Sequence, residues 1–340
     1  MWQQFLYDSG KPDVQTSVRQ CRDLQGCGRA MWQKYSEKVY LKKRKRRIVI
    51  STLAIFVLIP LTVYVGVHYW NDYNFMLVSV LILLYVMAPF FMMFERRKPR
   101  ARELVLVAVM TALTALGNIV CYITIPFQAG TAMAIVSGIA LGPEAGFLVG
   151  ALARFLCNFF LGQGPWTPWQ MFCWGILGFF AGLVFNKNDL DRKKSGHFRV
   201  VAGPVTGVLL AVAAAWIDAK LRGGGFFGWR LYLFGAAGML GGFLIQRKRL
   251  PVDDITLTIY GFLATFIIYG GIMNVAALVF NSYVSASGLT ISWDSLKILY
   301  ISGVPYDATH ACGSAFFLYV FGEKVIRKVE RVKIKYGIYR

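Results

Sequence analysis

Long apolar runs alternate with short polar segments along most of the chain. The runs are about 18 to 25 residues long, the length that an α-helix needs to cross roughly 30 Å of hydrocarbon. Within lipid every backbone N–H and C=O must bond inside its own segment, so these runs are predicted to be helices. The pattern predicts ten spans, at 47–68, 76–95, 104–123, 130–142, 143–161, 167–185, 199–217, 229–246, 255–281 and 298–321.

The fourth predicted span is the shortest, and the step Gly142-Pro143 separates it from the fifth. Proline cannot continue a helix, because it lacks the backbone N–H and its ring clashes with the preceding turn. We therefore expect 130–142 and 143–161 to form a tight or partly re-entrant hairpin.

Composition supports membrane residence. Of the 340 residues, 56% are hydrophobic and only 16% are charged, and the mean hydropathy is +0.51. A soluble domain carries about 25% charged residues. The sequence therefore predicts an all-α fold, a polytopic transmembrane helix bundle.

The net charge of +20 is concentrated between the apolar runs. Lys and Arg cluster at 42–47, 96–102, 187–199, 247–249 and from 324 onward. Basic loops stay on the cytoplasmic side and are attracted to anionic lipid heads, so we expect a multi-pass protein of the plasma membrane with both termini cytoplasmic, and no binding of nucleic acid. The predicted outer loop 218–230 is an exception, because it carries basic residues. The two spans beside it are therefore the least secure part of the predicted topology, although removing both spans would leave the orientation of every other span unchanged.

The sequence lacks the usual signatures of an enzyme. It has no Gly-x-x-x-x-Gly-Lys-Ser/Thr loop that would cradle ATP phosphates and no His-Glu-x-x-His or Gly-x-Ser-x-Gly motif. The six cysteines match no zinc spacing and no disulfide framework. We expect no catalytic residue, metal or cofactor in this chain.

Three residues are costly at membrane depth and are therefore candidates for function. Arg154 falls near the middle of its span, and Asp307 and His310 lie three apart on one face of the last span. Two compatible interpretations are open: Arg154 and Asp307 neutralise each other inside the bundle, or these residues line a polar cavity for a solute. The amides Asn158 and Asn274 favour hydrogen bonds between helices.

The segment from Asn158 to Gln170 is the densest polar signal. Its Pro and Gly residues predict a rigid outer turn, with Trp166, Trp169 and the amides Gln163 and Gln170 beside it. An aromatic belt at the membrane interface would explain the tryptophans alone. Because a belt needs neither glutamines nor a rigid turn, we predict the rim of a pocket for a flat, partly polar ligand.

Five motifs resemble those of a known family: Ala108 to Ala112, Gly142 to Gly146, Gly162 to Met171, Tyr269 to Asn274 and Pro305 to His310. They resemble the substrate-binding S components of energy-coupling factor (ECF) vitamin transporters, over roughly 103–185 and 252–337. Within that family the chain is most similar to the group associated with cobalamin uptake.

The resemblance implies a six-helix core, and this chain departs from that compact pattern by a helical hairpin before the core and an inserted pair within it. The implied layout is a basic cytoplasmic tail at 1–46, an N-terminal transmembrane hairpin and basic loop at 47–102, core helices one to four at 103–185, an inserted transmembrane pair at 186–251, core helices five and six at 252–325, and a basic cytoplasmic tail at 326–340.

The resemblance also implies the function. Such a chain would be the high-affinity substrate-binding subunit of an ATP-driven importer, for cobalamin or a related corrinoid, or else for another vitamin or a nucleobase-like micronutrient. A membrane coupling subunit would dock on Ala108, Ala112 and Ala115, and two cytoplasmic ATPases would use the ATP. The substrate-binding residues would be Asn158, Gln163, Trp166, Trp169, Gln170, Asn274, Asp307 and His310.

Two alternatives of other classes remain at this point. A membrane-embedded enzyme acting on a lipid or isoprenoid would use Asp307 and His310 as an acid/base pair. A stand-alone secondary transporter would be favoured by an inverted repeat between the halves, and the sequence has no evident one.

Overall fold

The computed structural model describes residues 101–124, 129–164, 166–185, 197–223, 225–245, 250–283 and 292–338. The predicted tail 1–46 and the predicted spans 47–68 and 76–95 lie outside the described residues. The described elements are α6 (Ala101–Thr124), α7 (Ala129–Leu141), α8 (Pro143–Leu161), α9 (Thr167–Val184), α10 (His197–Arg222), α11 (Trp229–Ile245), α12 (Asp254–Ala264), the π-helix η4 (Thr265–Gly270), α13 (Gly271–Tyr283), α14 (Trp293–Phe317), the π-helix η6 (Leu318–Gly322) and α15 (Glu323–Lys335).

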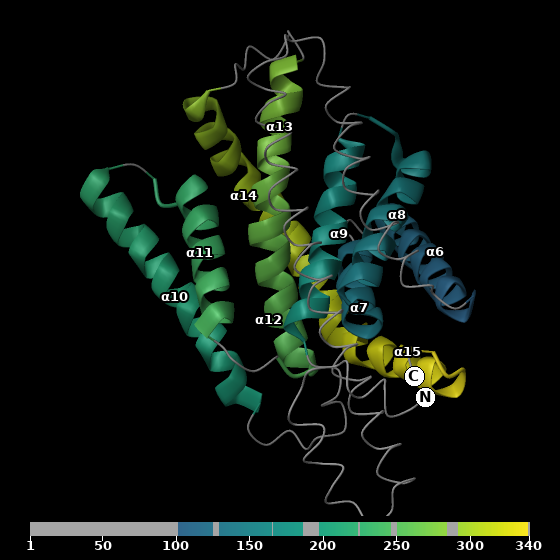
Figure 1. Cartoon of the computed structure of the whole chain (residues 1–340). Helices are drawn as coiled ribbons and strands as arrows, with labels where there is room; N and C mark the ends of the chain where they lie inside the picture. The colour runs from purple at the N-terminus through teal and green to yellow at the C-terminus, as the bar shows by residue number, and fades with distance from the viewer. Residues whose placement is uncertain are drawn as a thin grey trace, which may run out of the picture. The chain divides into compact units, whose positions relative to one another are not determined.

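The predicted all-α membrane fold is confirmed. The described residues are helical apart from short connections and contain no strand, only an isolated bridge between Phe185 and Leu250. Four helical stretches are long and apolar enough to cross a membrane: Ala101–Ile123, Pro143–Leu161, Thr167–Val184 and Asp254–Asn281. The last of these joins α12, η4 and α13 into one continuous helix, which stands near the middle of the bundle in Figure 1.

The Gly142-Pro143 step breaks the chain as predicted. α7 ends at Leu141 and α8 begins at Pro143, because proline is well suited to the first helical position. Gly142 has φ +99°, a conformation that glycine adopts without strain. Since α7 has only 13 residues and nearly all of them are buried, it is an internal helix of the bundle.

Glycines set the spacing of α7, α8 and α9. A Cβ atom at Gly138 would overlap the carbonyl group of Gly178, and one at Gly146 would overlap the backbone of Gly138. Small residues at such positions allow helix backbones to pack closely in lipid. The small-residue pairs of these helices are therefore used within the bundle.

The inserted pair packs against the core through α11. α10 and α11 meet at Gly207 and Gly238, where a Cβ on Gly238 would overlap Gly207. Figure 1 shows α10 outermost and α11 between it and the helix formed by α12 and α13. Tyr232 and Met239 of α11 share a buried apolar cluster with Phe266 of η4. The insertion is thus part of the packed bundle.

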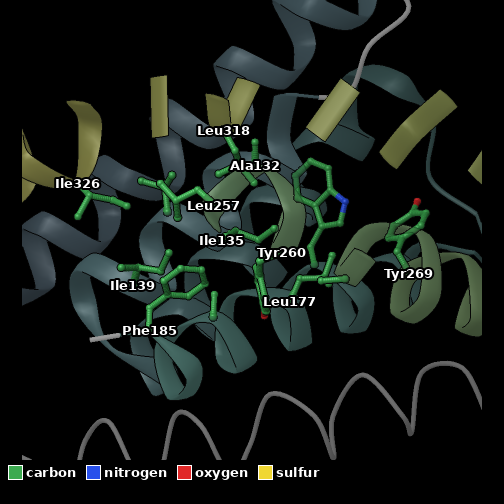
Figure 2. Close-up of a cluster of buried hydrophobic side chains, with 14 of the residues drawn as sticks. Ala132, Ile135, Ile139, Leu177, Phe185, Leu257, Tyr260, Tyr269, Leu318 and Ile326 are labelled. Atoms are coloured by element: carbon green, nitrogen blue, oxygen red, sulfur yellow. The ribbon is translucent and has the colours of Figure 1, made fainter. Parts of the chain in front are cut away.

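The C-terminal helix is longer than the predicted last span. α14 continues through η6 into α15, whose Ile326 is fully buried in the cluster of Figure 2 together with Leu318 and Leu257. Lys333 is also buried and donates from Nζ to the carbonyl oxygen of Ala140 at 2.6 Å. The segment that begins the expected tail at 326 is therefore a docked amphipathic helix up to Lys335.

Candidate functional site

A network of polar side chains joins the C-terminal end of α8 to the start of α9. We call it the outer network, after the turn that the sequence predicts on the outer side, and define it as Arg154, Asn158, Gln163, Thr167 and Gln170. Asn158 Nδ2 donates to Thr167 Oγ1 at 2.9 Å and to Gln170 Oε1 at 3.0 Å. Arg154 Nε donates to the same Gln170 Oε1 at 2.9 Å. Because Gln170 lies one helical turn into α9, a single amide oxygen ties the two helices together.

The outer turn holds this network in place. Thr167 Oγ1 donates to Gln163 Oε1 at 3.0 Å and accepts from the backbone N–H of Gly164 at 3.2 Å. Gly162 has φ +105° and its N–H bonds to the carbonyl oxygen of Asn158. The sequence correctly predicted a constrained turn, but it did not identify Thr167 as a member of the network. The position of Thr167 between two prolines was the available signal for such a role.

Arg154 is buried, with 7% of its surface exposed. Its guanidinium carbon lies 5.2 Å from the centroid of the Trp174 ring, within the range of a cation–π interaction. No ion pair joins Arg154 to an acidic residue of the described chain. The interpretation in which Arg154 and Asp307 neutralise each other is therefore wrong, because each has its own neutral partners.

Asp307 belongs to a second network, the carboxylate network, formed with Tyr232 and Asn274. Its Oδ2 accepts from the Tyr232 hydroxyl at 2.5 Å and from Asn274 Nδ2 at 2.8 Å. Two glycines leave the space that these side chains occupy: a Cβ on Gly270 would overlap Asp307, and one on Gly303 would overlap Asn274. Tyr232 comes from the inserted pair, and no sequence signal assigned it to this place.

His310 lies on the same helix as Asp307 but has other partners. Its Nε2 lies 2.8 Å from Thr131 Oγ1 of α7, and its ring meets the Tyr269 ring edge-on at a centroid distance of 4.4 Å. No hydrogen bond joins His310 to Asp307 among the described side chains. Asp307 and His310 therefore belong to separate hydrogen-bond networks.

Several buried polar atoms have no hydrogen-bond partner in the described chain: Asn158 Oδ1, Trp169 Nε1, Trp174 Nε1 and His310 Nδ1. An unsatisfied buried polar atom costs about 1–3 kcal/mol, so such atoms require an explanation. Asn158 belongs to the outer network, and the Trp174 ring stacks against Arg154 of the same network. Asn158 Oδ1 and Trp174 Nε1 therefore leave hydrogen-bonding capacity unused within and beside the outer network.

The predicted site residues thus fall into separate groups. Asn158, Gln163 and Gln170 meet in the outer network, whereas Asn274 and Asp307 meet in the carboxylate network. Trp169 is buried against the ring of Phe280, 6.4 Å away between centroids. Trp166 is 40% exposed and folds back over Gly164 at the rim of the turn.

The face of α6 that carries the alanine motif is open. Ala108 and Ala112 are exposed, in a row with the exposed apolar residues Leu104 and Leu113, whereas Ala115 is buried with 5% of its surface exposed. Of the candidate spans, α6 buries the smallest share of its apolar window, 33%. The geometry therefore makes Ala108 and Ala112, and not Ala115, accessible to another membrane protein.

No cluster of three or more metal-ligating side chains occurs within the described ranges. The donors of both networks are amides, hydroxyls and a guanidinium, which suit an organic ligand better than a transition metal. The arrangement can bind and orient a small molecule through hydrogen bonds and aromatic contacts.

Comparisons with known proteins agree with this picture. Residues 98–222 match the family model described as "ECF-type riboflavin transporter, S component". A UPF0397 protein of Aliivibrio fischeri is 32% identical over 99 residues, which are 27% of this chain and 53% of that protein. A UPF0397 protein of Vibrio atlanticus is 32% identical over 100 residues, 27% of this chain and 54% of that protein.

A third relative is covered more fully. A UPF0397 protein of Aliivibrio salmonicida is 30% identical over 133 residues, 36% of this chain and 72% of that protein. The chain spans about half the length of the first relatives given above, and no solved structure matches it. Taken with the buried polar site and the helical membrane fold, these matches show that the chain belongs to the family of ECF-type S components, which are transporter subunits and not enzymes.

Proposed function

We propose that this chain is the high-affinity substrate-binding subunit of an ATP-driven ECF-type importer of a vitamin. The observation that carries the proposal is the set of unpartnered buried polar atoms, Asn158 Oδ1 and Trp174 Nε1 among them, beside the constrained outer turn. Binding sites for small molecules combine apolar and aromatic walls with a few convergent polar groups. The outer network supplies those groups in a membrane protein of the right family.

The ligand is proposed to be flat and partly polar. Cobalamin or a related corrinoid is the first candidate, on the strength of the sequence motifs. Riboflavin is the second, because the family model that matches residues 98–222 carries its name. Another vitamin or a nucleobase-like micronutrient would use the same chemistry: stacking on tryptophan and hydrogen bonds to Asn158, Gln170 and Arg154.

The partners are proposed from the same family membership. A membrane coupling subunit would dock on the exposed face of α6 around Ala108 and Ala112, and two cytoplasmic ATPases would bind and hydrolyse the ATP. This chain itself would bind no cofactor. In the plasma membrane its basic segments would face the cytoplasm, with both termini on that side.

The direct test is to identify what the protein binds in cells. The full chain is purified in mild detergent from cells grown with cobalamin and riboflavin, and the extracted small molecules are identified by mass spectrometry. We expect one vitamin in near-stoichiometric amount, and a strong reduction in Asn158→Ala, which removes two hydrogen bonds of the outer network. Preparations that contain no more vitamin than an unrelated membrane protein would contradict the proposal.

A further inference from the structure

A cavity of about 430 Å³ lies between the inserted pair and the core, and we call it the insertion chamber. Most of its lining comes from α11, η4, α13 and the start of α14, and Ile176 and Phe180 of α9 and Tyr260 of α12 complete it. α11 lies beside the helix formed by α12 and α13 in Figure 1. The volume falls within the roughly 300–1,000 Å³ typical of small-molecule sites. None of the residues of the outer network lines it, so it is separate from the proposed vitamin site.

The chamber is apolar and aromatic. Trp229 and Trp293 lie at its end nearest the starts of α11 and α14, with ring centroids 5.5 Å apart in an edge-on contact. Three tyrosines belong to its walls. Tyr300 donates to the carbonyl oxygen of Gly271 at 2.9 Å and Tyr232 donates to Asp307, whereas the Tyr260 hydroxyl has no hydrogen-bond partner among the described residues. Apolar rings therefore line most of the space, and two of the three hydroxyl groups bond into the surrounding protein.

Asp307 lies directly behind the Tyr232 wall and is only 3% exposed. Its hydrogen-bond partners are the neutral groups of Tyr232 and Asn274, and none of the ion pairs between described residues involves it. Removing a carboxylate from water without a countercharge is costly. A cationic donor would add an attraction between opposite charges that the neutral donors Tyr232 and Asn274 do not supply.

We propose that the insertion chamber is a second ligand site, and that it binds an organic cation with a compact aromatic or aliphatic body. The body fills the apolar space, and the positively charged nitrogen takes the place of the Tyr232 hydroxyl on Asp307 Oδ2. Tyr232 is then a positioning residue, which shields the carboxylate when the chamber is empty and turns aside when a cation enters. This inference goes beyond the proposed vitamin uptake and does not depend on it.

The test uses 2-phenylethylamine as the probe and 2-phenylethanol as its neutral counterpart of the same shape. Binding of radiolabelled amine to the purified full chain is measured by equilibrium dialysis against a detergent-only control, with the unlabelled alcohol as competitor. We expect saturable binding of the amine at least tenfold tighter than that of the alcohol. Equal affinities, or no saturable binding, would overturn the proposal.

Four variants locate the site. Asp307→Asn keeps the shape of the side chain and is expected to weaken amine binding at least tenfold, to the level of the alcohol. Tyr232→Phe removes the competing hydroxyl and is expected to strengthen it severalfold, whereas the control Tyr319→Phe, an exposed tyrosine outside the chamber, changes it less than twofold. Ala236→Phe fills the chamber from α11 and is expected to abolish it.

The variants also separate the possible failures. Unchanged binding in Asp307→Asn or Ala236→Phe would place the amine elsewhere and sink the proposal, and a Tyr232→Phe variant that binds no more tightly would refute the replacement of the hydroxyl. Arg154→Lys disturbs the outer network alone, so it is expected to leave amine binding intact. If Arg154→Lys loses vitamin binding but keeps amine binding, the two sites are separate, as the proposal requires.

Discussion

At the scale of single residues, polar side chains inside this bundle work through shared acceptors. Gln170 Oε1 receives hydrogen bonds from both Arg154 and Asn158, and Asp307 Oδ2 receives them from both Tyr232 and Asn274. Sequence reasoning found the members on the core helices, because charged and amide residues are conspicuous in apolar runs. It missed Tyr232 and left open whether Arg154 pairs with Asp307, because partner choice depends on how distant helices rotate toward one another.

Arg154→Lys is expected to weaken vitamin binding about tenfold while changing thermal stability little. Lysine keeps the positive charge but lacks the planar guanidinium, which bonds Gln170 through Nε and stacks on Trp174. The measurement is a ligand titration paired with a melting curve of the same preparation. If binding and melting temperature fell together, or neither changed, Arg154 would have no specific role in ligand binding.

At the scale of elements, the apolar runs of the sequence predicted the positions of most of the described helices. The break at Gly142-Pro143 and the extent of α8 follow from residues whose backbone preferences are strong. The docking of α15 was not predicted, because burial of Lys333 depends on a carbonyl oxygen that α7 presents 193 positions earlier in the chain. The π-helical turns of η4 and η6 were also not predicted, because apolar periodicity marks a helical span and does not distinguish a π-helical turn from the α-helix around it.

Gly138→Ala is expected to destabilise the bundle by about 1–3 kcal/mol, the usual cost of overpacking a well-packed core. Its Cβ would overlap the backbone carbonyl of Gly178, which cannot move aside without shifting α9. The matched control is Gly117→Ala on α6, where nothing lies within 4 Å and alanine favours the helix. The free energy of unfolding in detergent is compared; equal effects of the two substitutions would contradict the proposed close packing of α7 on α9.

Lys333→Met is expected to cost about 1–3 kcal/mol, because it leaves the carbonyl oxygen of Ala140 and the carboxylate of Glu330 without the ammonium group. Lys335→Met, on the exposed side of α15, is the control and should be nearly neutral. Limited proteolysis of the C-terminal segment checks the effect. A Lys333→Met protein that resists cleavage like the wild type would show that this contact does not hold α15.

At the scale of the whole molecule, the candidate spans of the described chain differ in how much apolar surface they bury. α8 and α9 bury most of their apolar windows, 67% and 78%, whereas α6 buries 33%. Membrane residence and the all-α class follow from composition and run length alone, since the bilayer imposes them on any such chain. The identity of the ligand does not, because it depends on the shape and polarity of a pocket assembled from separate helices.

Replacing both Ala108 and Ala112 by Phe is expected to abolish co-purification with the coupling subunit while leaving ligand binding unchanged. Two bulky rings would hold a partner helix away from a surface that small residues let it approach. The matched control is Ala237→Phe, an equally exposed alanine on α11. Association that survives the double substitution would remove α6 as the docking face.

The central claim is that this protein binds a vitamin through the outer network. It is tested most directly by titrating the purified full chain with cobalamin, riboflavin and other vitamins while recording the fluorescence of its nine tryptophans, among them Trp169 and Trp174 near the network. The account predicts saturable quenching by one vitamin, lost in Asn158→Ala. Absence of saturable quenching by every vitamin, or quenching that persists unchanged in Asn158→Ala, would contradict it.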